Sequence, residues 1–264
     1  GNWRGIFRHK NEAGAVMVML VFVGLFVARA LNLLVGATIA ILAAAFLVFS
    51  VSKSSMILLP VCLTLAFLVE RARTTKGRAF AAFTLLIAFN VATLGSSFPG
   101  PIRTNLVKIM PDVTFTGRTD LWRYAMEHVA KSPLVGYGIG AFWRTGATMY
   151  KDRETNEPED ASGWVAELGT DSHNGYLDVA VSTGLPGALL LIVSIVLLPL
   201  RDIAAALRQP GNRLMTRFYI RCWVFVLYLS SVESLLMPLN PIWYIMLQSV
   251  FGLLLLAHYR VQRE

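Results

Sequence analysis

Long apolar runs, separated by short polar segments, dominate the chain. A helix that crosses a bilayer needs about 20 mostly apolar residues, because each residue adds about 1.5 Å and the hydrocarbon core is about 30 Å thick. The runs therefore predict an all-α polytopic membrane helix bundle with about seven transmembrane helices. The predicted spans are 13–28, 31–51, 55–69, 79–95, 174–200, 218–236 and 241–258.

Prolines predict irregularities in two of these spans. The third span is short and contains Pro60, which removes a helical hydrogen bond and favours a kink. The fifth span contains the stretch 182–187, in which Gly184, Pro186 and Gly187 lie close together. We expect the fifth helix to kink there.

The distribution of lysine and arginine predicts the orientation of the spans. Short loops rich in these residues stay in the cytoplasm. Such residues follow the third, fifth and last spans, which seven alternating spans place on the same side. They are Arg71, Arg73, Lys76, Arg78, Arg201, Arg208, Arg213, Arg217, Arg260 and Arg263.

The long segment 96–173 then lies on the outer side. It contains ten acidic and eight basic residues, so it carries −2 while the rest of the chain carries +10. We expect three parts: four transmembrane helices with a basic outer start in 1–95, a large outer loop with short amphipathic helices in 96–173, and three transmembrane helices with a cytoplasmic C-terminus in 174–264.

The composition supports a membrane protein. Hydrophobic residues make up 55% and charged residues 15% of the chain, whereas a soluble domain has about 25% charged residues. This excludes a disordered chain, a disulfide scaffold and an ordinary cytosolic enzyme. The net charge of +8 is explained by cytoplasmic loops rather than by nucleic acid as a partner. Cys62 and Cys222 lie in apolar runs and indicate no disulfide or zinc site. The chain begins at Gly1 without a signal-peptide pattern, and we expect it to be the C-terminal part of a longer protein.

Several basic residues lie on the predicted outer side, where positive charge is disfavoured. Arg4, Arg8 and Lys10 precede the first span, and Lys53 lies in the turn between the second and third spans. One such residue alone is explained by contact with lipid phosphates. The whole set favours an anionic ligand at the membrane surface.

The spacing of apolar residues in 117–129 predicts an amphipathic helix in the large loop. Its apolar face includes Trp122, which would rest on the bilayer or pack against the bundle. Arg118 lies at the N-terminal end of this helix. Backbone N–H groups and the helix dipole favour anions there, and a guanidinium adds a bidentate phosphate donor.

Two further segments of the loop carry weaker signals. The glycine-rich run 136–140 is not preceded by a strand and has no lysine partner, so it favours a tight bend or close packing over nucleotide binding. Residues 150–170 are polar and predict a flexible flap. Their acidic residues lack the spacing of metal ligands.

The start of the fifth span combines a histidine with several acids. We expect Asp171 or Ser172 to cap this helix and His173 to lie in its first turn, at the level of the lipid headgroups. The helix dipole would favour a neutral imidazole, which is the form that a general base requires. Asp178 and Glu233 are acids near the outer ends of spans, where a functional role and pairing with Arg or Lys are both expected.

Taken in order, these segments resemble the O-antigen ligase and polymerase superfamily of bacterial membrane glycosyltransferases, which includes exopolysaccharide polymerases. The resemblance runs from residue 3 to about residue 190. The segments that carry it are Trp3–Phe7 with His9–Asn11, Ser52–Ser54, Gly117–Thr119 with Trp122, Pro133 with Gly136–Gly140, and His173–Leu177 followed by Gly184 and Gly187.

The resemblance implies a metal-independent, inverting transferase in the bacterial inner membrane. The basic start of 1–95 and the large loop 96–173 would then be periplasmic. Its donor would be a glycan on undecaprenyl pyrophosphate, its acceptor a lipid A core or a second lipid-linked glycan, and it would need no cofactor. Arg118 and Lys53 would hold the pyrophosphate, although family ligases often have an arginine where this chain has Lys53. His173 would act on the acceptor hydroxyl. The supporting substrate-binding residues would be Arg4, Lys10, Asn11 and Asn174.

Two other classes of function remain open. A transporter or flippase for lipid-linked oligosaccharides would place polar groups near the midplane and often shows repeated halves, whereas the polar groups here gather on one face. A non-catalytic subunit of an envelope polysaccharide export system would explain the spans, but not Arg118 and His173 on the same side. Within the enzyme class the sequence does not separate ligase from polymerase. The opening Trp3–Asn11 resembles the exopolysaccharide branch of the family, and this resemblance favours a polymerase.

Overall fold

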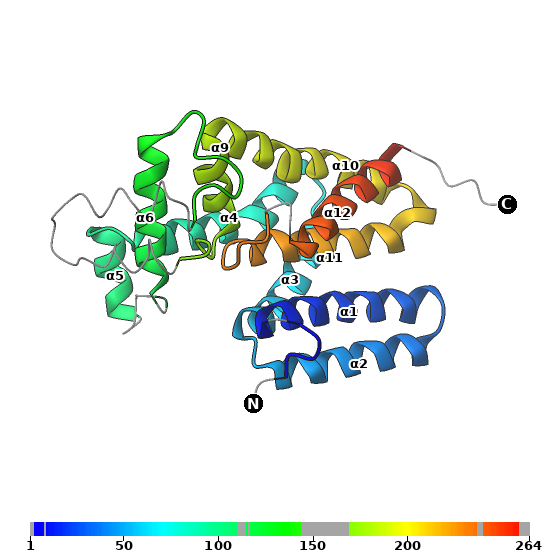
Figure 1. The fold of residues 1–264 in the computed structure, drawn as a ribbon. Helices are drawn as coiled ribbons and strands as arrows, with labels where there is room; N and C mark the ends of the chain where they lie inside the picture. The colour runs from blue at the N-terminus through cyan, green and yellow to red at the C-terminus, as the bar shows by residue number, and fades with distance from the viewer. Residues whose placement is uncertain are drawn as a thin grey trace, which may run out of the picture. The chain divides into compact units, whose positions relative to one another are not determined.

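The computed structural model describes residues 3–7, 9–109, 115, 117–143, 169–236 and 240–258. Every regular element in these ranges is helical (Figure 1). The elements are α1 Lys10–Ala30, α2 Leu33–Ser50, α3 Lys53–Arg71, α4 Thr75–Gly95, α5 Pro101–Ile109, α6 Arg118–Lys131, α9 Gly175–Ile192, the π-helix η1 Val193–Leu197, α10 Leu198–Arg208, the 3₁₀-helix η2 Pro210–Asn212, α11 Arg213–Leu229 and α12 Pro241–His258.

The described helices include six that are long and apolar enough to cross a membrane. They are α1, α2, α3, α4, the continuous stretch Gly175–Arg208 and α12. The predicted all-α polytopic class is thus confirmed, and the chain is a multi-pass membrane protein. The predicted span 218–236 corresponds to α11, which begins earlier, ends at Leu229 and is only 17 residues long. Helix α3 runs through Pro60 from Lys53 to Arg71.

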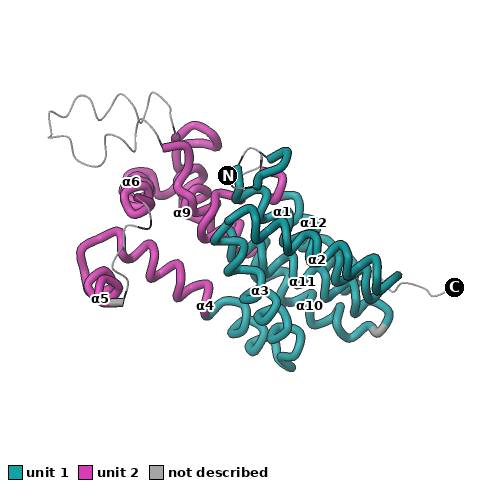
Figure 2. The backbone as a smooth tube through the Cα atoms, turned by 90° about the horizontal axis from the view of Figure 1, so that it is seen from below, with its two compact units in different colours: residues 1–84, 195–229, 244–264 teal, residues 85–194, 230–243 magenta. Residues whose placement is uncertain are grey.

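The chain divides into two compact units (Figure 2). The first unit comprises residues 1–84, 195–229 and 244–264, and the second comprises 85–194 and 230–243.

Helix α11 lies in the core of the first unit, where it packs against α1 and α3. Its residues from Cys222 to Leu229 are all buried. The indole Nε1 of Trp223 donates to the carbonyl of Ile195 at 2.6 Å, and the hydroxyl of Tyr228 donates to the carbonyl of Ala82 at 2.9 Å. These bonds satisfy polar groups that would otherwise be costly inside an apolar bundle.

The second unit is organised by the packing of α6 on α9. Gly117, with φ +85°, precedes α6, and the helix confirms the prediction for residues 117–129. Trp122 is buried against Ala125 and Leu177. Its indole Nε1 donates to the carbonyl of Ser172 at 2.9 Å. The amphipathic helix therefore packs against α9 through its apolar face instead of resting on the bilayer with Trp122.

Helix α9 breaks at Gly184, which has φ +72° and ψ 179° and confirms the predicted kink. Such a break leaves backbone groups without helical partners, and the loop 133–138 supplies them. A Cβ atom on Gly136 would lie 2.6 Å from the backbone nitrogen of Gly184, so only glycine fits this approach. The glycine run therefore serves close packing, as predicted. The joining bonds run from the N–H groups of Leu185, Tyr137 and Gly138 to the carbonyls of Pro133, Val181 and Ser182, at 2.7, 2.9 and 2.8 Å.

Candidate functional site

Arg118 is the first residue of α6, and its guanidinium contacts the segment that follows α11. One terminal nitrogen donates to the carbonyl of Val232 at 2.7 Å. The other lies 3.5 Å from Oε1 of Glu233, and the side chain is 20% exposed. The anion at this helix start is thus a carboxylate of the chain itself. These two contacts do not exhaust the five N–H donors of a guanidinium.

The segment 171–174 forms a tight turn before α9. The N–H of His173 donates to Oδ1 of Asp171 at 2.8 Å, and the N–H of Asn174 donates to the Ser172 hydroxyl at 3.1 Å. His173 has φ +49°, a left-handed conformation that costs a non-glycine residue about 1–2 kcal/mol. Such strain is found preferentially at functional sites.

The predicted placement of His173 inside the helix is wrong. Asn174 caps α9 by accepting a hydrogen bond from the N–H of Leu177 at 3.1 Å, so neither Asp171 nor Ser172 is the cap. His173 lies two residues before the first residue of α9. It is therefore held by the turn and its acidic neighbours rather than by the helix.

The imidazole of His173 faces two carboxylates. Its Nδ1 lies 3.4 Å from Oδ1 of Asp171 and 3.6 Å from Oε2 of Glu233, and the side chain is 37% exposed. The Glu233 carboxylate raises the pKa of His173 above its ordinary value and Asp171 adds to this effect, whereas burial and the charge of Arg118 oppose it. The carboxylates therefore act against the expected preference for a neutral imidazole, because they stabilise its protonated form.

Glu233 joins the two residues that the sequence singled out. One of its oxygens contacts Arg118 and the other contacts His173, and its side chain is only 15% exposed. The expected pairing of this acid with an arginine is confirmed. We call Arg118, His173 and Glu233 the charged triad. It can neutralise negative charge through the guanidinium and accept a proton on the imidazole.

The carboxylate of Asp178 is hydrogen-bonded to the turn 171–174 that carries His173. It is 2% exposed, and its Oδ1 accepts hydrogen bonds from the N–H of Ser172 and from the indole Nε1 of Trp143, each at 3.0 Å. The hydroxyl of Ser234 bonds to Asp178 and also lies 2.9 Å from Oδ1 of Asp171. The buried carboxylate therefore fixes the backbone that presents the imidazole.

Asn174 is fully buried, and its amide groups are bonded to the protein. Besides capping α9, it donates from Nδ2 to Oδ1 of Asn90 at 3.1 Å and to the carbonyl of Ser231 at 3.4 Å. Asn90 in turn donates to the Ser231 hydroxyl at 2.8 Å. These bonds join the start of α9, directly after His173, to Asn90 and Ser231. Only the polarity of Asn90 within an apolar span signalled this network in the sequence.

The remaining predicted substrate-binding residues belong to the first unit. Arg4 and Lys53 are exposed, and Lys10 and Lys53 begin α1 and α3. Asn11 accepts a hydrogen bond from the Ser52 hydroxyl at 3.4 Å, so the starts of α1 and α3 lie side by side.

Within the part of the chain that the structure describes, no group of three His, Cys, Asp or Glu side chains has an arrangement that could hold a metal ion. The predicted flap, residues 150–170, falls largely in the segment 144–168, outside the described residues, as does Arg8.

Fold and site together define a multi-pass membrane protein with an arginine and an imidazole–carboxylate pair at the start of two packed helices. A family model described as O-antigen ligase matches residues 38–192, so the chain belongs to the O-antigen ligase family. The predicted family resemblance is thereby confirmed.

The chain is also similar to the exopolysaccharide production protein ExoQ of Rhizobium meliloti (strain 1021). The two are 29% identical over 243 residues, which cover 88% of this chain and 54% of that protein. The chain thus spans about half the length of this curated relative. No solved structure matches it.

Proposed function

We propose that the chain carries the catalytic residues of a bacterial inner-membrane glycosyltransferase. The enzyme moves a sugar chain from an undecaprenyl-pyrophosphate donor to an acceptor hydroxyl at the periplasmic face. The observation that carries this proposal is the charged triad, in which Glu233 links Arg118 to His173. Membership of the O-antigen ligase family supports it.

His173 acts as the general base in the proposed reaction. The acceptor oxygen bonds to the anomeric carbon, the bond from that carbon to the pyrophosphate oxygen breaks, and the acceptor proton passes to His173. Since Nδ1 faces Asp171 and Glu233, Nε2 is the nitrogen that meets the acceptor. The Glu233 carboxylate stabilises the imidazolium as it forms, which lowers the barrier to proton transfer. Attack from the face opposite the leaving group inverts the anomeric carbon.

Arg118 stabilises the departing pyrophosphate. Pyrophosphate leaves readily once its charge is neutralised, so cations at its oxygens supply most of the catalysis and no metal or cofactor is required. Arg118 lies at the start of α6, where the helix dipole adds to the attraction. Lys10 and Lys53 also begin helices, where a cation is disfavoured unless an anion is bound. We propose these lysines, with Arg4 and Asn11, as further substrate-binding residues.

The acceptor class follows from the similarity to ExoQ. That relative is described as an exopolysaccharide production protein. This favours a second lipid-linked glycan as the acceptor, so that the product is a longer polysaccharide rather than a glycan on lipid A core.

The test uses the whole protein in proteoliposomes with an undecaprenyl-pyrophosphate-linked oligosaccharide, with and without EDTA. We expect longer lipid-linked chains that persist in EDTA and are lost in His173→Ala and Arg118→Ala. His258→Ala is the matched control, because His258 lies at the end of α12 in the first unit, where its imidazole is 3.8 Å from the Asp202 carboxylate.

Two outcomes would overturn the proposal. Movement of the donor across the bilayer without a covalent product would identify a transporter. Near-normal transfer by both His173→Ala and Arg118→Ala would remove the triad from the chemistry.

A further inference from the structure

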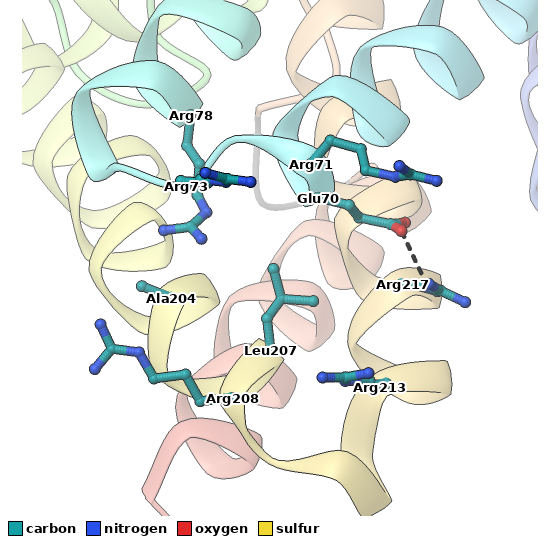
Figure 3. A pocket seen from close by; sticks show the side chains of 9 residues that line it. All are labelled: Glu70, Arg71, Arg73, Arg78, Ala204, Leu207, Arg208, Arg213 and Arg217. Carbon is teal, nitrogen blue, oxygen red and sulfur yellow. Dashed lines mark ion pairs between the residues drawn. The ribbon is translucent and has the colours of Figure 1, made fainter.

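A pocket of about 260 Å³ lies in the first unit, where the end of α3, the start of α4, the end of α10 and the start of α11 meet (Figure 3). In Figure 3, Arg73 and Arg78 project from the α3–α4 segment on one side of the pocket, and Arg208 and Arg213 lie on the other. The lining residues are Glu70, Arg71, Arg73, Arg78, Ala204, Leu207, Arg208, Arg213 and Arg217.

The positive charge of this arginine pocket is largely uncompensated within the described part of the chain. The pocket is lined by six arginines and by one carboxylate, that of Glu70, which pairs with Arg217 at 2.9 Å. The guanidinium of Arg71 lies 4.8 Å from the ring centroid of Phe67. Like charges collected in one concave site repel each other and attract counter-ions strongly. The arrangement therefore favours a bound anion.

Arg78 supplies a second and independent observation. Its residue is only 8% exposed, and its Nε makes no hydrogen bond to any residue that the structure describes. An unsatisfied donor on a buried charged group is unfavourable, and native proteins rarely retain one without a partner. Because Arg78 lines the pocket, a ligand there can supply the missing acceptor.

We infer that the arginine pocket binds a phosphate group, either the headgroup of an anionic phospholipid or a soluble phosphate compound. Guanidinium groups match phosphate oxygens in two-pronged hydrogen bonds, and several of them can share one phosphate. The volume lies just below the range of about 300–1,000 Å³ typical of small-molecule sites, so it suits a headgroup-sized ligand. Helices α3 and α4 are both long and apolar enough to cross a membrane, and a turn between two spans lies at the membrane surface, where phospholipid headgroups are available.

The test measures thermal unfolding of the whole protein in phosphatidylcholine nanodiscs. One arm adds cardiolipin to the discs, and the other adds inorganic pyrophosphate to cardiolipin-free discs. At least one probe is expected to raise the unfolding midpoint. Arg208→Gln and Arg213→Gln are expected to weaken the apparent affinity for that probe roughly tenfold each. Arg201→Gln is the matched control, because Arg201 lies on α10 outside the pocket and is 62% exposed.

A response to cardiolipin alone identifies a lipid headgroup as the ligand, and a response to pyrophosphate alone identifies a soluble phosphate. Both results support the inference. It is contradicted if neither probe shifts the midpoint, or if Arg201→Gln weakens the response as much as Arg208→Gln does. An unchanged response in Arg78→Met, which removes the buried guanidinium with its unpartnered Nε, would also contradict it.

Discussion

Replacing Gly136 by alanine tests the close packing that holds α9 at its kink. Gly136 has φ +67°, and a Cβ atom there would lie 2.6 Å from the backbone nitrogen of Gly184 and from the carbonyl carbon of Ser182. Gly140 is the matched control. It has φ +72°, but a Cβ atom there would have no neighbour within 4 Å.

Both variants carry the cost of backbone strain, and only Gly136→Ala adds the cost of overpacking. A left-handed conformation costs alanine about 1–2 kcal/mol in both cases. Overpacking against backbone atoms, which cannot move aside as a flexible side chain can, adds about 1–3 kcal/mol in Gly136→Ala alone. We therefore expect Gly136→Ala to lower the free energy of unfolding by about 2–5 kcal/mol and Gly140→Ala by about 1–2 kcal/mol.

Thermal unfolding of both variants in the same detergent measures this difference. The glycan-transfer assay should follow it, because the loop 133–138 is bonded to the same helix that His173 precedes. Equal destabilisation by the two substitutions would refute the packing argument and leave only backbone strain. A Gly136→Ala protein as stable as the wild type would refute both parts of the reasoning.

Three further predictions concern the site. In Glu233→Gln the pKa of His173 should fall toward its ordinary value. In a pH–rate profile from pH 5 to 9, the rise of the transfer rate with pH should therefore move to lower pH, and the maximal rate should drop. A rise at the same pH as in the wild type would show that the carboxylate does not act on His173. Arg118→Lys keeps the charge but loses the planar fork, so kcat/KM should fall about tenfold or more with normal membrane insertion, and wild-type kinetics would count against a role in holding pyrophosphate. Trp122→Phe leaves the carbonyl of Ser172 without its donor and should cost about 1–3 kcal/mol in thermal unfolding, whereas an unchanged midpoint would show that the bond contributes nothing.

The sequence predicted the features that depend on local pattern. Spans appear as long apolar runs, the helix beginning at Arg118 as an amphipathic pattern, and the break in α9 as glycine and proline within 182–187. The last predicted span, 241–258, agrees with α12 to the residue. These features are set by neighbouring residues, so a single sequence suffices to find them.

The features that the sequence missed depend on contacts between distant residues. The sequence indicated that Glu233 could pair with an arginine or lysine, but it did not identify the partner as Arg118, which lies 115 positions earlier in the chain. The Glu233 carboxylate also raises the pKa of His173, which is the opposite of the effect expected from the helix dipole. Asp171 and Ser172 are both residue types that cap helices well, but the hydrogen bonds to Asn90 and Ser231 select Asn174 as the cap.

The central claim is that the imidazole of His173 and the carboxylate of Glu233 act as one catalytic unit. The most direct test is a double-mutant cycle of kcat/KM for glycan transfer with His173→Ala, Glu233→Gln and the double variant. Groups that act as a unit are not additive, so removing the carboxylate after the imidazole should cost little more. We predict that the double variant equals His173→Ala within about threefold, whereas losses that multiply would show that the two residues act independently.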